Sequence, residues 1–338
     1  MKNKQTDPIH PLKAPILKGS TAALSKAISL VESSLETHSL EAEQLLEQLS
    51  KDTASKRSNS IRIGVSGVPG VGKSTFIEAL GGQLTKEGKK VAVLTIDPSS
   101  QQSGGSILGD KNRMQHLSQS PLAYIRTTPA AAHLGGVAKN TRPSIQLCEA
   151  AGFEVIIIET VGVGQSELEV QDMVDFFLLL HLPGAGDEIQ GIKRGIMEVA
   201  DALVVNKADG ANAPLAKKSQ QFLQHAIHAF PSRANHWEVP VLLASATEGH
   251  GIDQVWKTIE HYIDIQRKTG EFERQRQQQL IHGWHAEINQ ALLQSFATDV
   301  PMQSLVQQLE KDILSGATTK NEAKRKAIAS FRGKWPSS

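Results

Sequence analysis

Residues 61–75 combine glycines, a lysine and hydroxyl side chains in the spacing of a phosphate-binding loop. Gly67, Gly72, Lys73 and Ser74 match the pattern G-x-x-x-x-G-K-[ST]. The glycines allow a sharp turn, so that backbone N–H groups and the N-terminus of the following helix converge on an anion. Lys73 adds a positive charge for the β- and γ-phosphates, and the Ser74 hydroxyl is a ligand for Mg²⁺. The sequence therefore predicts a nucleotide phosphate site formed by Gly67, Val68, Pro69, Gly70, Val71, Gly72, Lys73, Ser74 and Thr75.

A second motif, Asn206-Lys207-Ala208-Asp209, indicates which base is bound. An aspartate carboxylate accepts two hydrogen bonds from guanine, through N1–H and the 2-amino group. Adenine lacks this paired donor edge, so the wrong base leaves polar groups without partners. After the last predicted strand, the backbone N–H of Ala246 is placed to meet guanine O6. The predicted guanine contacts are Asn206, Lys207, Asp209, Ser245, Ala246 and Thr247.

Two acids follow predicted strands, at the sheet edge where open α/β sheets bind ligands. Asp97 follows the strand at 91–96, and Glu159 follows the strand at 153–158. In a protein with a phosphate loop, Glu159 is placed to hold the Mg²⁺ shell, and Gly162 brings its backbone N–H to the γ-phosphate. We therefore predict Lys73 and Glu159 as the catalytic residues and Gly162 as a further nucleotide contact.

Alternating strands and helices must position these residues. Apolar runs rich in β-branched residues predict strands at 61–65, 91–96, 153–158, 176–182, 201–205 and 239–244, with a shorter strand at 124–126. Helical patterns separate them. The alternation predicts an α/β fold, a P-loop NTPase with a doubly wound, mainly parallel sheet, over residues 61–265. Residues 1–60 are predicted to form an N-terminal arm and a helical extension.

Beyond residue 266 the strand patterns stop, and residues 266–338 predict a helical arm. Leu280, Trp284, Ile288 and Leu292 recur every four residues along one helix face. These helices have no sheet of their own to cover. They must bury their apolar rows against each other, the nucleotide domain or a second chain, and of these we expect a dimerisation arm and a homodimer.

Composition excludes several classes of function. The chain has 338 residues, with 36 Lys and Arg against 35 Asp and Glu, so no strong field favours nucleic acid or an anionic membrane as a partner. A single cysteine, Cys148, excludes an internal disulfide framework. No apolar run approaches the roughly 20 residues that span a bilayer. The first residues lack both an apolar core and arginine, unlike a secretory signal or a transit peptide, so we expect a cytoplasmic protein.

Together these motifs resemble the metallocentre-assembly class of P-loop GTPases, which has Glu in place of Asp in the E-x-x-G step. Within that class the chain is similar to the GTPase chaperones of adenosylcobalamin-dependent methylmalonyl-CoA mutase, formerly described as arginine/ornithine transport-system kinases. The resemblance covers about residues 17–335 of the chain. The segments that carry it are Asp97-Pro-Ser-Ser, Gly104-Gly-Ser-Ile-Leu-Gly-Asp110, His133-Leu-Gly-Gly136, Glu159 to Glu167, and Gly184 to Lys193.

The resemblance implies slow GTP hydrolysis that gates the loading of cofactor into the mutase and protects it. It also implies that Ser74, Asp97, Asp110 and Glu159 surround Mg²⁺, and that this chain binds no cobalamin itself. Segments 98–113, 160–170 and 183–195 would be nucleotide-sensitive switches. The sequence departs from the family at 101–103 and 130–132, where switch contacts and turnover are expected to differ.

Three alternatives remain open at this stage. A nickel-inserting GTPase of the same class would bring Cys and His metal sites, which one cysteine opposes. A P-loop kinase would not need the guanine-recognising Asp209. A GTP-binding scaffold without hydrolysis differs only in turnover, which a single-turnover phosphate-release assay measures. The group that positions the attacking water is also open, because the spacing of Gln165 from Gly162 does not match the familiar pattern.

Overall fold

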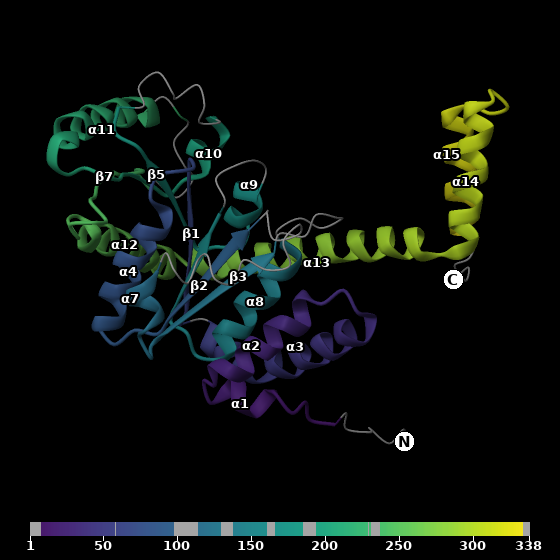
Figure 1. Ribbon diagram of the computed structural model, residues 1–338, viewed down its shortest axis with the longest axis horizontal. Coiled ribbons are helices and arrows are strands. Elements are labelled where there is room, and N and C mark those ends of the chain that lie inside the picture. The colour runs from purple at the N-terminus through teal and green to yellow at the C-terminus, as the bar shows by residue number, and fades with distance from the viewer. Residues whose placement is uncertain are drawn as a thin grey trace. The chain divides into compact units, whose positions relative to one another are not determined.

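The computed structural model describes residues 8–57, 59–97, 114–129, 138–160, 166–184, 194–228, 230 and 237–333 (Figure 1). The side chains of residues 53–57, 97, 129, 138, 166 and 194 are outside this description. No helix among the described residues combines the length and the apolar character needed to cross a bilayer.

A seven-stranded sheet forms the centre of the nucleotide-binding part. Its strands are β1 (Ile61–Gly67), β2 (Val91–Asp97), β3 (Ala123–Pro129), β4 (Val155–Glu159), β5 (Phe176–His181), β6 (Ala202–Val205) and β7 (Val241–Leu243). Their order is β3-β2-β4-β1-β5-β6-β7, and every pair is parallel. The predicted doubly wound α/β fold is confirmed. The strand that leads into the phosphate loop, β1, lies between β4 and β5.

Helices cover both faces of the sheet because side chains alternate between two cores along each strand. In β5, Phe176 and Leu178 belong to one core, whereas Phe177 and Leu179 belong to the other. The helices are α1 (Lys13–Leu17), α2 (Thr21–Glu32), α3 (Glu36–Arg57), α4 (Lys73–Lys86), α7 (Gln115–Ser118), α8 (Ala138–Ala150), α9 (Ser166–Gln171), α10 (Arg194–Val199), α11 (Ala213–His228), α12 (Ile252–Thr269), α13 (Glu271–Thr298), α14 (Val300–Leu314) and α15 (Lys320–Arg332).

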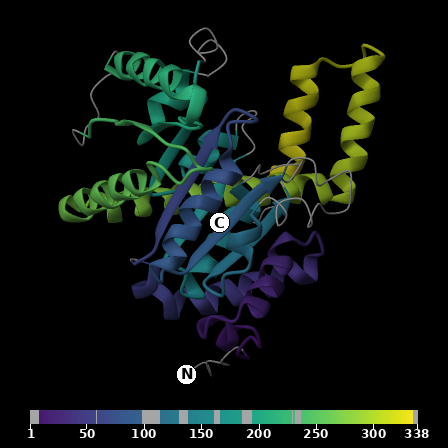
Figure 2. The ribbon, with the colours of Figure 1, turned by 60° about the vertical axis from the view of Figure 1, so that its left-hand side comes forward.

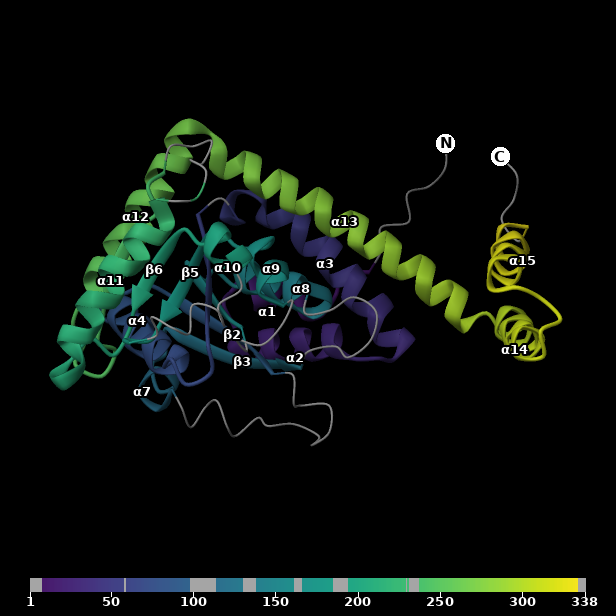
Figure 3. The same cartoon turned by 90° about the horizontal axis from the view of Figure 1, so that it is seen from above.

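The N-terminal helices form part of the helical layer on one face of the sheet. The N-terminal helices α1, α2 and α3 pack beside α8 (Figure 2). Helices α4 and α7 lie on the other side of β2 and β3 from α2 and α8 (Figure 3). Helix α12 joins the layer of α4, where Val255, Trp256 and Ile259 are buried. The N-terminal extension therefore belongs to the same core as the sheet.

The chain divides into two compact units. The first contains the described residues up to Leu280, and the second contains those from Ile281 onward. In the second unit α14 packs against α15, and the Phe296 and Phe331 rings lie 5.2 Å apart, edge to face. Helix α14 begins after Asp299, whose side chain accepts a hydrogen bond from Met302 N at 2.9 Å.

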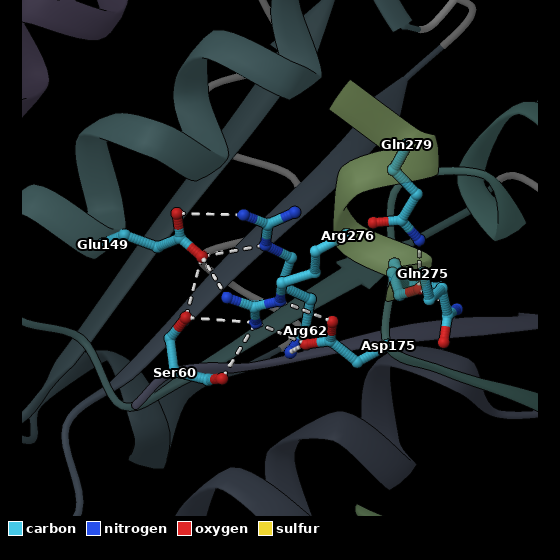
Figure 4. A network of polar contacts seen from close by, with 8 residues as sticks. Ser60, Arg62, Glu149, Asp175, Gln275, Arg276 and Gln279 are labelled. Carbon is cyan, nitrogen blue, oxygen red and sulfur yellow. Dashed lines mark hydrogen bonds and ion pairs between the residues drawn. The ribbon is translucent and has the colours of Figure 1, made fainter. Parts of the chain in front are cut away.

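A buried charge network fastens the start of α13 to the sheet (Figure 4). The Arg276 guanidinium donates to both carboxylate oxygens of Asp175, at 2.8 and 2.6 Å, and to Ser60 O at 2.9 Å. Arg62 donates to both oxygens of Glu149, at 2.8 and 3.0 Å. Desolvation lowers the pKa of Arg276, but Asp175 and Glu149 more than compensate, so its pKa is raised. Two buried acids and two guanidiniums are therefore balanced in this network.

Candidate functional site

The phosphate loop connects β1 to α4 through two glycines at positions where a Cβ would meet close neighbours. Gly67 has φ 150°, and a Cβ there would lie 2.5 Å from the carbonyl oxygen of Leu180. Gly72 is left-handed, with φ 92°, and a Cβ there would lie 2.9 Å from the Asn206 side chain. Helix α4 begins directly afterwards at Lys73 and carries no acid in its first turn. The loop therefore presents the positive end of the α4 helix dipole to an anion, with no side-chain acid nearby in the first turn to offset it.

Lys73 folds back over the loop that precedes it. Its Nζ donates to Gly67 O at 2.8 Å and to Val68 O at 3.3 Å. Burial lowers the pKa of Lys73, against the nearby charges of Glu159 and Glu167, which raise it. The ammonium is thus held at the loop by weak neutral acceptors, which phosphate oxygens can replace.

The proposed magnesium ligands are partly assembled. Ser74 Oγ donates to Glu159 Oε1 at 2.9 Å. Adjacent ligands of an octahedral Mg²⁺ are about 3.0 Å apart, given metal–oxygen distances near 2.1 Å. The Ser74 hydroxyl and the Glu159 carboxylate therefore fit the ion in chemistry and in spacing. Asp97 ends β2, in the strand next to β4, but its side chain is outside the description, as are all of Asp110 and Gly162.

Asn206 joins the phosphate loop to the predicted guanine site. It is 1% exposed, its Nδ2 donates to Val71 O at 2.9 Å, and its Oδ1 accepts from Ala246 N at 3.3 Å. Lys207, in a left-handed conformation with φ 58°, donates from Nζ to Gly70 O at 2.8 Å. These bonds bring the phosphate loop, the motif at 206–209 and the segment at 245–247 together at one edge of the sheet.

Hydroxyl groups orient the Asp209 carboxylate. Its Oδ2 accepts hydrogen bonds from Ser245 Oγ and, at 3.4 Å, from Thr247 Oγ1. Ser245 is itself fixed, because its N–H donates to His250 O at 2.9 Å and its Oγ accepts from Glu248 N at 3.2 Å. Ser245, which bonds the half-buried Asp209 carboxylate, is followed directly by Ala246, whose N–H donates to Asn206 Oδ1. A base with adjacent donors and one acceptor matches such a set.

One acid beside the site was not predicted to have a role. Glu167, in the first turn of α9, is 3% exposed, and its charge raises the pKa of Lys73 against the effect of burial. The sequence placed it inside a family motif, but burial of a carboxylate has no local sequence pattern. The predicted switch segments lie outside the described residues at 98–113, 161–165 and 185–193, as do the departures at 101–103 and 130–132.

Comparisons with known proteins give consistent findings. The family model described as "Methylmalonyl Co-A mutase-associated GTPase MeaB" matches residues 24–300. The chain is 46% identical over 314 residues to a probable GTPase of Mycobacterium bovis, covering 93% of this chain and 92% of that protein. It is 39% identical over 344 residues to the methylmalonic aciduria type A homolog, mitochondrial, of Mus musculus, covering 99% and 82%. A crystal structure of LAO/AO transport system kinase has a TM-score of 0.73 and 33% identity, covering 95% and 96% of the two chains.

Proposed function

Because the chain belongs to the family of methylmalonyl-CoA mutase-associated GTPases, we propose that it is a Mg²⁺-dependent enzyme that hydrolyses GTP to GDP and phosphate. We further propose that it uses this cycle to gate adenosylcobalamin loading and protection of a methylmalonyl-CoA mutase or a related acyl-CoA mutase. The observation that carries the proposal is the bonding of Asn206 to both Val71 and Ala246. Through Asn206 the phosphate loop and the predicted base site are in direct contact.

In this proposal each residue has one task. Backbone N–H groups of Gly70 to Ser74 cradle the phosphates, and Lys73 leaves the loop carbonyls to neutralise the β- and γ-phosphates. Ser74 and Glu159 would hold Mg²⁺, with Asp97 and Asp110 completing the acidic shell. The ion supplies further charge neutralisation when bound. Asp209 selects guanine, Ala246 meets its O6, and Gly162 contacts the γ-phosphate.

The proposed link to the mutase is the segment from Gly184 to Gly195. Its described first residue is anchored, because Gly184 N donates to Ser219 Oγ of α11 at 2.9 Å. The segment follows β5, next to the strand that leads into the phosphate loop. A γ-phosphate shifts such a segment only through contacts that differ between its two states. Coupling of about 1–3 kcal/mol between nucleotide and mutase would be typical.

We also propose a cytoplasmic homodimer formed through α13. Large apolar side chains along this helix are exposed, and Leu280 and Trp284 are 63% and 53% exposed. Ile288 and Leu292 continue the same row at spacing four. An uncovered apolar row of this length favours a partner surface.

Calorimetry of the chain with a cobalamin-dependent acyl-CoA mutase tests the chaperone proposal. Titrations with GDP and with a non-hydrolysable GTP analogue should give affinities that differ by about 5- to 150-fold, and the mutase should change nucleotide affinity by the same factor. Equal affinities would refute gating through binding. A separate single-turnover assay should release phosphate from GTP but not from ATP, and its failure would favour a GTP-binding scaffold.

A further inference from the structure

Helix α9 is held directly against the strand that leads into the phosphate loop (Figure 1). Gly64 of β1 makes this possible, since a Cβ there would lie 3.2 Å from Val170 and 2.8 Å from Phe177. Val170, Met173 and Val174 are buried in the same core. Helix α9 therefore has a fixed position over β1.

Glu167 occupies the end of α9 that is nearest the phosphate loop. The helix connects β4 to the parallel strand β5, so it runs back across the sheet and begins at the carboxyl edge of the strands. Glu167 precedes Val170 by three residues and so shares the face that packs on β1. Its 3% exposure and its charge effect on Lys73 agree with that placement.

The carboxylate of Glu167 has an unused acceptor. Among the described residues, its buried Oε2 has no hydrogen-bond partner. The Lys73 ammonium donates to Gly67 O and Val68 O instead. Burying a carboxylate oxygen without a hydrogen-bond donor costs folding free energy. Beside a phosphate site, a bound ligand or water can supply the donor.

We propose that Glu167 accepts a hydrogen bond from the water that attacks the γ-phosphate and thereby orients it. The inference rests on the proposed GTP hydrolysis. In that step the water oxygen bonds to the γ-phosphorus, the bond from that phosphorus to the β–γ bridging oxygen breaks, and both water protons leave with the products. Ser74 and Glu159 already supply the pair of oxygens that fits the metal, so Glu167 is assigned to the water and not to the ion.

The test compares Glu167→Gln with Glu169→Gln. Gln keeps the shape of Glu167 and removes the charge, and Glu169 is a half-buried acid on the same short helix. Single-turnover hydrolysis should fall about a hundredfold in Glu167→Gln. GDP affinity and the Mg²⁺ concentration for half-maximal rate should stay unchanged, and Glu169→Gln should match the unmodified chain. Glu167→Asp, which keeps the carboxylate, should recover part of the lost rate.

The alternative outcomes are distinct. Unchanged hydrolysis in Glu167→Gln overturns the inference. A rise in the Mg²⁺ requirement that accounts for the whole loss also overturns it, because it assigns Glu167 to the ion. Loss of GDP binding in both Glu167→Gln and Glu167→Asp would give Glu167 a structural role and refute the proposal. If the unmodified chain binds GTP but does not hydrolyse it, this measurement alone refutes the proposed GTPase function, before any variant is compared.

Discussion

Replacing Arg276 by Met should destabilise the first unit by about 3 kcal/mol. Arg276 makes two bonds to Asp175 and one to Ser60 O, and it covers the Phe272 ring at 4.4 Å. Met keeps much of the packing on Phe272 but removes the charge, which leaves a buried excess of one carboxylate. Breaking a buried pair in this way costs about 3–5 kcal/mol. We expect the lower end because Asp175 still accepts from Arg62 N at 2.7 Å.

Arg274→Met is the matched control. Arg274 lies on the same helix, but its ion pair with Glu271 is exposed, at 65% and 36% for the two side chains, and should contribute about 0–1 kcal/mol. Urea unfolding followed by tryptophan fluorescence measures the difference. Hydrogen exchange at the amides of residues 271–280 reports whether the start of α13 opens before the rest.

The double variant Arg276→Met, Asp175→Asn separates charge from packing. Asn removes the unpaired charge and its Oδ1 still accepts from the Arg62 N–H, so the double variant should be more stable than the sum of the two single losses predicts. A loss of stability in Arg276→Met no larger than in Arg274→Met would contradict a buried, unpaired carboxylate, and so would simple additivity of the changes at 276 and 175.

Three further outcomes concern the nucleotide and the arm. Lys73→Ala should abolish GTP hydrolysis without unfolding the chain, because the phosphates lose their neutralising charge while the bonds lost to Gly67 O and Val68 O lie within the loop alone; turnover at the parent rate would show that the site is misplaced. Asp209→Asn should weaken GTP binding by well over tenfold, since each hydrogen bond that the charged acid accepts contributes roughly 1.5–3 kcal/mol; equal binding of ATP and GTP by the unmodified chain would contradict this. A chain ending after Leu280 should be a monomer by light scattering and still bind GDP, whereas a dimer would place the interface in the first unit.

The sequence predicted the sheet well because most of the strands are short apolar runs ended by polar or glycine residues. The strand predicted at 176–182 is Phe176–His181, and the one predicted at 239–244 is the shorter Val241–Leu243. The strand predicted at 124–126 extends to Ala123–Pro129, because its ladder with β2 continues beyond the apolar residues. Thr127 and Thr128 have side chains that fit a strand but give no clear alternation.

The charge network could not be predicted from the sequence. Arg276 meets Asp175 across 101 positions of the chain, and Arg62 meets Glu149 across 87. Each of these residues looks like an ordinary surface charge within its own segment of the sequence. For the same reason the sequence gives no reason to place Phe272 and Gln279 in the core of the first unit, where they are 2% and 4% exposed. A truncation that removes only the second unit must therefore end after Leu280 and not at residue 266, where the predicted arm begins.

The central position of β1 has a consequence for synthesis on the ribosome. The strand is complete at Gly67, but both of its neighbours come much later, and the bond from Arg62 N to Asp175 spans 113 residues. At translation rates of 5–20 residues per second, β1 waits on the order of ten seconds for a strand to pair with. During that interval the nascent chain exposes an apolar strand that a chaperone or an early partner must cover. The phosphate loop can therefore acquire its folded shape only after β5 has left the exit tunnel.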